Sequence, residues 1–181
     1  MHSNNRKTSM QKSSFVIITL AALLSACDGS PKKGATSQAT AEAAPVALGK
    51  MGTADGLEFT LTDVKTPSQV GAGGVGPKAA AGETFVVVSY MLKNTSGKPL
   101  PLMERPGVEL VDAKGQTYAP DIAASLMAAG MMNDPSGMAS DLNPNVSAKT
   151  KSAWLISKSA FDKGTWTLVV ASDPRLTFAL K

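Results

Sequence analysis

The chain has 181 residues and a formal net charge of +4, with 18 basic and 14 acidic residues but only one histidine and one cysteine. Its length allows one domain of ordinary size together with tails. Charges of both signs are mixed along the chain, so no basic stripe is available to follow a phosphate backbone, and we expect no nucleic-acid partner.

The N-terminal segment has the pattern of a secretion signal. Residues 1–13 are polar and basic, and an apolar run of about ten residues follows from Phe15 to Leu24. A helix that spans a bilayer needs about 20 apolar residues, so this run is too short for a span but suits the hydrophobic region of a signal peptide. We predict that residues 1–26 are a signal peptide that is removed.

The apolar run ends in Leu24-Ser25-Ala26-Cys27, which resembles the lipobox of bacterial lipoproteins. The resemblance implies that a diacylglycerol is attached to the Cys27 thiol and that the new N-terminus is acylated, for example with palmitate. Several acyl chains hold a protein stably at a bilayer, whereas one chain holds it only marginally. We therefore expect a lipid-anchored protein of the cell membrane, facing the periplasm or the exterior. Asp28 resembles the inner-membrane retention signal of enterobacterial lipoproteins.

Two other readings of this segment stay open, namely a one-pass anchor and an ordinary signal with a chance cysteine. Removal of residues 1–26 would leave 15 basic residues against 14 acidic ones, a net charge of about +1. The processed chain would contain no histidine, and its one cysteine would be its first residue. This composition excludes nucleophilic catalysis with a histidine base, internal disulfides, and metal sites built from imidazole or thiolate. We expect no catalytic residue, no metal site and no cofactor.

Small and polar residues with two prolines follow the cysteine, and they are too poor in large apolar side chains to form a core. We predict that residues 27–47 comprise the lipidated cysteine and a flexible tether, and that residues 48–181 form the folded domain. The first predicted strand is Leu57–Thr62, which alternates apolar and polar residues after an Asp55-Gly56 turn. Thr66–Gly82 is rich in glycine and proline, so we predict an exposed hairpin connection there.

Glu83–Asn94 is the longest run of β-formers in the chain, and its side chains alternate with a period of two. We assign to the core face the set Val86, Val88, Tyr90 and Leu92. The opposite set becomes polar towards Lys93 and is expected to face solvent at that end. Val108–Asp112 and Gln116–Ala119 predict a hairpin in which Gly115 supplies a positive φ.

The segment Ile122–Asp141 lacks a strand period, and Ile122–Met131 predicts a short helix that ends near Asn133. Its methionines are Met127, Met131, Met132 and Met138. Flexible, polarisable thioethers suit an adaptable partner or ligand surface, or a Cu(I) site, but they also suit packing over an open end of the fold. Asp121, Asp134 and Asp141 could meet Ca²⁺, although their spacing matches no loop motif.

Three further strands are predicted before the C-terminus. In Ser147–Ser157 we expect Ala153 and Leu155 to be buried, and we leave Trp154 open. Thr165–Val170 places Trp166, Leu168 and Val170 on one face, and Leu176–Leu180 is the last strand. Seven or eight short strands at this spacing predict an all-β, immunoglobulin-like antiparallel sandwich.

The order of these features resembles a bacterial family of domains of unknown function, described as telokin-like, immunoglobulin-type sandwiches in secreted proteins and lipoproteins. The similar segments are Phe85–Ser96, Val108–Tyr118, Leu142–Pro144, the strand of Trp154 and the strand Trp166–Val170. Members often have glycine where this chain has Asn145, and the 121–141 segment is longer and richer in Met and Ala than the family implies. The resemblance implies a fold but no activity.

These observations favour a tethered binding module that contacts another envelope protein or a small ligand. A long methionine-rich loop on a rigid scaffold suits that role. An enzyme is disfavoured because the carboxylates show no paired spacing. Copper handling through the methionine-rich loop and a purely structural envelope role remain as alternatives.

Overall fold

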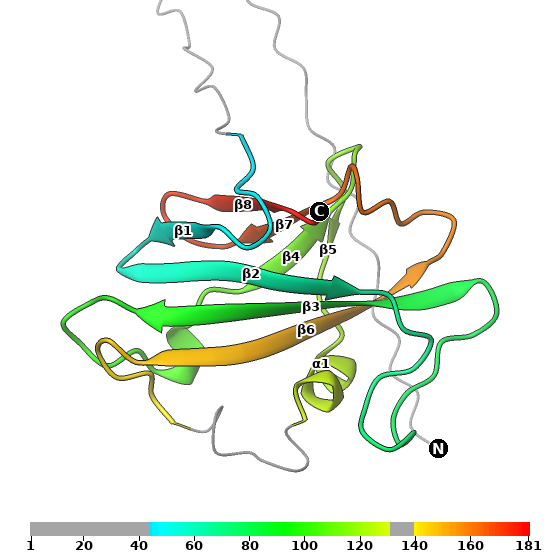
Figure 1. The fold of residues 1–181 in the computed structure, drawn as a ribbon, viewed down its shortest axis with the longest axis horizontal. Coiled ribbons are helices and arrows are strands. Elements are labelled where there is room, and N and C mark those ends of the chain that lie inside the picture. The colour runs from blue at the N-terminus through cyan, green and yellow to red at the C-terminus, as the bar shows by residue number, and fades with distance from the viewer. Residues whose placement is uncertain (1–43, 131–139) are drawn as a thin grey trace, which may run out of the picture. The chain divides into compact units, whose positions relative to one another are not determined.

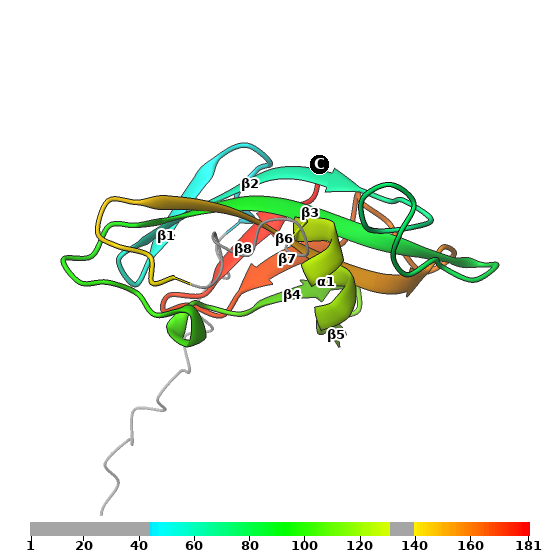
Figure 2. The same cartoon turned by 90° about the horizontal axis from the view of Figure 1, so that it is seen from below.

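Two antiparallel sheets face each other in the computed structural model, which describes residues 44–130 and 140–181 (Figures 1 and 2). The described chain contains eight strands and little helix, which confirms the predicted all-β sandwich. None of the described helices is long and apolar enough to cross a membrane.

The first sheet has the strand order β1-β2-β3-β6. Its strands are β1 (Met51–Ala54), β2 (Leu57–Lys65), β3 (Glu83–Asn94) and β6 (Ser147–Ser157). The bounds of β3 match the prediction, because its continuous β-formers end at a dense turn sequence. The sequence pattern missed β1, whose residues Met51–Ala54 include glycine and alanine and carry a weak β signal.

The second sheet has the order β5-β4-β7-β8. Its strands are β4 (Val108–Val111), β5 (Thr117–Tyr118), β7 (Thr167–Val170) and β8 (Leu176–Ala179). The predicted hairpin between β4 and β5 is present, and Gly115 has a φ of 80°. Hydrogen bonds from the backbone N–H groups of Gln116 and Lys114 hold the pKa of the Asp112 carboxyl below its usual value.

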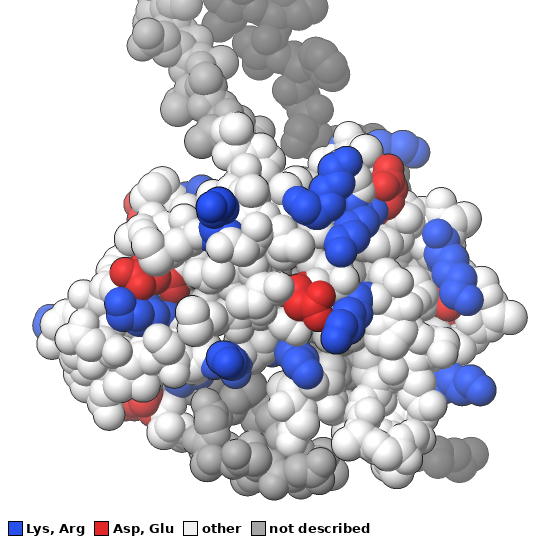
Figure 3. Space-filling model, in the orientation of Figure 1, with Lys and Arg blue, Asp and Glu red and all other residues white. Residues whose placement is uncertain are grey.

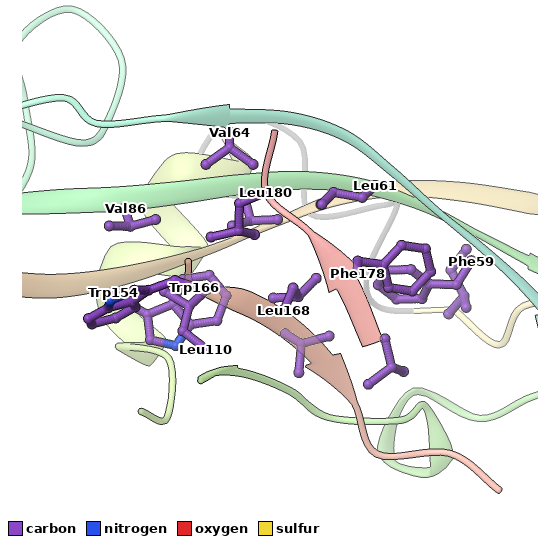
Figure 4. Close-up of a cluster of buried hydrophobic side chains, with 14 of the residues drawn as sticks. Phe59, Leu61, Val64, Val86, Leu110, Trp154, Trp166, Leu168, Phe178 and Leu180 are labelled. Carbon is purple, nitrogen blue, oxygen red and sulfur yellow. The ribbon is translucent and has the colours of Figure 1, made fainter. Parts of the chain in front are cut away.

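The main core lies between the sheets, where side chains from both inner faces interdigitate (Figure 4). Val86, Val88 and Leu92 of β3 are buried as predicted, and Tyr90 is half-buried against the same cluster. Trp154 is also buried, and its indole N–H donates to the carbonyl oxygen of Tyr118 over 2.9 Å. This bond satisfies the polar end of a large apolar side chain and links the two sheets.

A second, smaller cluster lies on the outer face of the first sheet. Its buried members are Val70, Phe85, Val87, Ala124 and Ala153. The loop after β2 folds back through a Gln69–Lys78 bridge and inserts Val70 into this cluster, while helix α1 (Ile122–Ala129) packs on β6. The loop is therefore anchored at Val70, although most of its residues are exposed as expected.

Helix α1 begins at Asp121, whose carboxylate accepts a hydrogen bond from the Ala124 N–H over 2.8 Å. It ends at Gly130, which has a φ of 76° and lies before the predicted stop at Asn133. This helix forms hydrogen bonds with the main chain of β6 at one residue, Ala153. The Ala153 carbonyl accepts from the Asp121 N–H, and the Ala153 N–H donates to the Ser125 hydroxyl.

The prediction that Leu155 is buried was wrong, since its side chain is 43% exposed. Ala153 and Leu155 share the outer face of β6 because side chains alternate along a strand. Helix α1 covers Ala153, and the loop covers Phe85 on the neighbouring strand, but Leu155 lies beyond both.

At the other end of the domain, Val46 lies at the end of the predicted tether, and its N–H donates to the Thr177 carbonyl of β8.

Asn94 is fully buried at the end of β3, although a turn asparagine is normally exposed. Its side-chain N–H groups donate to the carbonyls of Lys98 and Leu142, each over 2.7 Å, and its side-chain oxygen accepts from Ser96. All its polar atoms are thus satisfied, and one side chain fixes the turn after β3 to the segment before β6.

Asn145 occupies the third position of a tight turn with a φ of 64°. Pro144 precedes it, and the Val146 N–H donates to the Asn143 carbonyl over 3.1 Å, which is the pattern of a type II turn. Asparagine tolerates this left-handed conformation, and glycine adopts it without steric cost. A glycine, which the family resemblance implies at this position, would therefore also fit the turn.

We expect Asn145→Val to lower the free energy of unfolding by about 1–2 kcal/mol, because a β-branched side chain is strained at positive φ. Asn145→Gly is expected to leave it unchanged or slightly raised. Thermal unfolding of both variants of the full chain measures the difference. Equal melting temperatures for the valine and glycine variants would show that the turn relaxes to another conformation.

Candidate binding groove on the outer face of the first sheet

Two hollows of about 280 and 300 Å³ lie on the outer face of the first sheet. Both are lined by Ser89 of β3 and Lys151 of β6, so they adjoin there. We call the combined depression the outer-face groove. It is lined by Thr62, Asp63, Lys65, Pro67, Gln69, Val70, Gly71, Val87, Ser89, Tyr90, Ala128, Ala129, Lys149, Thr150 and Lys151.

The floor of the groove follows from strand register. Ser89 of β3 lies between Asp63 on β2 and Lys151 on β6, and the next outward position, Met91, lies beside Lys149. Side chains at every second residue share one face of a sheet. The polar residues of three strands therefore meet at this row, whereas Val87 continues the floor into the apolar cluster below α1.

A β-bulge at Thr62 shapes one side of the groove. Leu61 pairs with Tyr90 and Asp63 pairs with Ser89, so Thr62 is the extra residue on β2. Its hydroxyl donates to the Ser89 carbonyl over 2.9 Å. The bulge brings Asp63 to the outward row, where its carboxylate lies 3.3 Å from the Lys65 ammonium. Bulges re-aim side chains in this way and are frequent beside functional sites.

The walls of the groove are α1 and the loop after β2. Ala128 and Ala129, in the last turn of α1, line one hollow each. Gln69 lines the other side, and its side-chain amide donates to the Gly74 and Gly76 carbonyls within its own loop. Gly71 and Gly76 have positive φ, and a Cβ at either would collide with a backbone carbonyl, so this loop conformation requires glycine.

The two β6 lysines give the groove its charge. Lys149 and Lys151 are exposed, and neither forms an ion pair with a carboxylate among residues 44–130 and 140–181. Asp63, the one carboxylate lining the groove, already pairs with Lys65. Figure 3 shows this face of the molecule, on which Lys and Arg side chains outnumber Asp and Glu. The groove is suited to a partner that carries carboxylates.

The same groove offers main-chain hydrogen bonds. Since β6 is the last strand of its sheet, every second residue directs its N–H and C=O groups away from β3. Helix α1 satisfies these groups at Ala153. The outward residues Lys149 and Lys151 have no such cover within the described part of the chain, so an extended segment could pair there.

Of the four methionines predicted as a possible site, the structure places only Met127. It lies in α1, is half-buried, and packs against the smaller apolar cluster, which is the packing role that the sequence had left open. Cys27, Met131, Met132, Met138 and Asp134 lie outside the described residues. Asp121 caps α1, and no group of three or more potential metal ligands occurs within the described ranges.

Sequence reasoning missed Ser89, Lys149 and Lys151. A signal was present, because a serine interrupts the apolar run of β3 and two lysines alternate along β6. Only the register shows that these positions are neighbours.

Residues 46–174 match the family described as domain of unknown function (DUF4352). The matched range contains the whole of the outer-face groove and every described strand except β8.

The chain is also similar to three individual proteins. It is 42% identical over 117 residues to the uncharacterized protein YxkC of Bacillus subtilis strain 168, a match that covers 64% of this chain and 65% of the relative. The chain thus spans slightly less than two thirds of that relative's length. A conserved hypothetical protein from Bacillus anthracis has a solved structure with a TM-score of 0.63 and 26% identity, covering 74% of this chain and 94% of the other.

An uncharacterized β-sandwich protein from Clostridium difficile superposes with a TM-score of 0.53 at 12% identity, covering 77% of this chain and 97% of the other. At this identity the similarity supports the fold alone. None of the three descriptions names an enzymatic activity.

Proposed function

The chain belongs to the DUF4352 family, a domain of unknown function, and from this premise we propose that it is a lipid-anchored envelope protein whose sandwich binds an extended, acidic segment of another envelope protein. The observation that carries the proposal is the coincidence of two features on β6. Within the part of the chain that the structure describes, the outward main-chain groups at Lys149 and Lys151 are uncovered, and the ammonium groups of the same two residues have no ion-pair partner.

Such a segment would add a strand beside β6, and its backbone would bind by the hydrogen bonds of an antiparallel or parallel pair. Alternate side chains of the added strand would face the groove. Carboxylates at these positions would meet Lys149 and Lys151, and small apolar side chains would lie near Ala128 and Ala129. The main-chain bonds would provide affinity, and the charges would provide register and partner choice.

The lipid anchor on Cys27 and the predicted tether support this role, since a tether of about 20 residues gives a mean reach of roughly 25 Å from the anchor. The two alternatives receive less support. Met127 packs against the small cluster, so the described methionine does not favour copper handling. A purely structural role does not account for the free outward main-chain groups of β6 at Lys149 and Lys151 in the described chain.

The test compares three forms of the full lipoprotein as cross-linkable bait in native membranes. They are the wild type, Lys149→Glu combined with Lys151→Glu, and Lys50→Glu combined with Lys114→Glu. The last pair changes the net charge equally, but its exposed lysines do not line the groove. We expect one partner to be captured by the wild type and the control, with at least a tenfold loss for the β6 variant. Added salt should also weaken capture.

An acidic peptide of alternating Glu and Val should compete with the captured partner, whereas its Lys and Val counterpart should not. Equal capture by all three forms would overturn the assignment to the groove. Lysines on edge strands can also serve to prevent sheet-to-sheet association. Self-association of the β6 variant, with partner capture unchanged, would therefore identify the lysines as a solubility device.

A further inference from the structure

A smaller cavity of about 130 Å³ lies at one end of the main core. Its floor is the inner face of the first sheet, formed by Phe59, Tyr90 and Leu92 together with the inward side chains of β6. Its cover is the connection from β3 to β4, which contains the short helix η1 (Leu102–Glu104) and continues through Arg105. Tyr90 and Thr150 line both this cavity and one hollow of the outer-face groove, so the two sites adjoin at these two residues.

Arg105 is the feature of this cavity that internal packing does not explain. One terminal nitrogen, Nη2, donates to the Ser140 carbonyl over 2.7 Å. The Nε atom is buried and has no hydrogen-bond partner, and no described carboxylate forms an ion pair with the guanidinium. Buried polar groups are nearly always hydrogen-bonded, and charged groups lose most when they are not. The Nε–H group of this half-buried arginine is therefore available to an acceptor that enters the cavity.

Tyr90 supplies a second polar group beside an apolar wall. Its ring stacks on Phe59 with a centroid distance of 4.6 Å, and its hydroxyl lies 3.1 Å from the Ser152 hydroxyl. Burial raises the pKa of the Tyr90 phenol, so the hydroxyl stays neutral and able to donate. The cavity thus combines the Arg105 guanidinium and the hydroxyl-bearing residues Tyr90 and Thr150 with the apolar surfaces of Phe59 and Leu92.

We propose that this cavity binds a small organic carboxylate, with its anionic group on Arg105 and its short apolar body against Phe59 and Leu92. A guanidinium matches a carboxylate because its planar N–H groups can donate two parallel hydrogen bonds. The volume corresponds to about four water molecules at roughly 30 Å³ each, which restricts the body to a few carbon atoms. The guanidinium comes from the cover and the apolar surfaces of Phe59 and Leu92 from the floor, so a few polar groups meet a mainly apolar lining, as in other small-ligand sites.

The test uses nuclear magnetic resonance on the isotope-labelled full chain, with butyrate as the probe. The Nε–H group of arginine gives its own signal, and the chain offers Arg175, which is exposed on the surface, as an internal control. We expect butyrate to shift the Arg105 Nε–H signal and the Tyr90 ring signals saturably. Arg175 should show only the small linear drift that added salt produces.

Three comparisons make the result specific. Butyramide has the same shape without the charge and should leave the Arg105 signal unshifted, and inorganic phosphate has the charge without the apolar body and should bind at least tenfold more weakly. Arg105→Lys keeps a positive charge but loses the planar pair of guanidinium N–H donors. The Tyr90 ring signals should then show at least a tenfold loss of butyrate affinity. Arg175→Lys should bind butyrate as the wild type does. Unchanged dispersion of the core signals verifies that both variants fold.

Equal shifts at Arg105 and Arg175, or a response to butyrate that never saturates, would overturn the site. Binding of butyramide as tight as that of butyrate would show that the cavity recognises apolar shape alone. Binding of phosphate as tight as that of butyrate would show that it recognises charge alone. Either outcome would contradict the proposed ligand class.

Discussion

Val88→Asp is expected to unfold the domain. Val88 is fully buried in the middle of β3, between Val64 on β2 and Ser152 on β6, and its side chain contacts the main core. An uncompensated charge in such a position costs about 3–5 kcal/mol. A domain of this size has a total stability of about 5–15 kcal/mol, so most or all of it would be lost. Thermal unfolding and the loss of protease resistance measure the effect.

Met91→Asp is the matched control, because Met91 lies on the same strand with its side chain on the outer face. It is half-buried and pairs with Lys149, so a carboxylate there stays solvated and meets a positive charge. We expect its stability to differ from that of the wild type by about 1 kcal/mol or less. If Val88→Asp melted near the wild-type temperature while Met91→Asp unfolded, the inward and outward faces of β3 would have to be exchanged.

Cys27→Ser is expected to release the protein from the membrane fraction. The proposed anchor consists of acyl chains on this residue, and a serine hydroxyl cannot accept the thioether-linked diacylglycerol. Membrane affinity rises with each buried acyl chain, so loss of all chains should move the protein from the membrane pellet to the soluble fraction. Sedimentation and partitioning into detergent measure the change.

Ser30→Ala is the control for Cys27→Ser, since it alters the predicted tether without touching the lipobox. It should remain in the membrane fraction. A Cys27→Ser chain that still sediments with membranes and partitions into detergent would contradict the lipid anchor and would favour the one-pass anchor. The fold and the two proposed sites would stand, because Cys27 lies outside the described residues.

The proposed sites share β6 but can be tested apart. Lys149 and Lys151 line only the outer-face groove, and Arg105 and Ala148 line only the inner cavity, whereas Thr150 lines both. Charge reversal at the lysines should therefore leave butyrate binding unchanged, and Arg105→Lys should leave partner capture unchanged. A loss in both assays from either change would indicate a general disturbance of β6.

The sequence by itself determined the strands other than β1 and most of the main core. The alternation in Glu83–Asn94 identified Val86, Val88 and Leu92 as buried. A strand with one apolar face removes that face from water only by turning it towards the core, and this fixes which side chains point inward. It also determined the hairpin at Gly115 and the helix from Ile122, because turn and cap chemistry is local. The lipobox is local in the same sense, and the anchor it implies stays a prediction.

Only the tertiary structure decided which outer-face residues are covered. Phe85, Val87 and Ala153 are buried by α1 and the loop after β2, while Leu155 on the same face is exposed, and no local pattern separates these cases. The groove depends on register and on the bulge at Thr62, which bring Asp63, Ser89 and Lys151 together. The Arg105 cavity depends on a connection that crosses between sheets. These contacts join residues far apart in the chain. They depend on how the strands and loops pack together, which the local apolar–polar pattern of each segment does not specify.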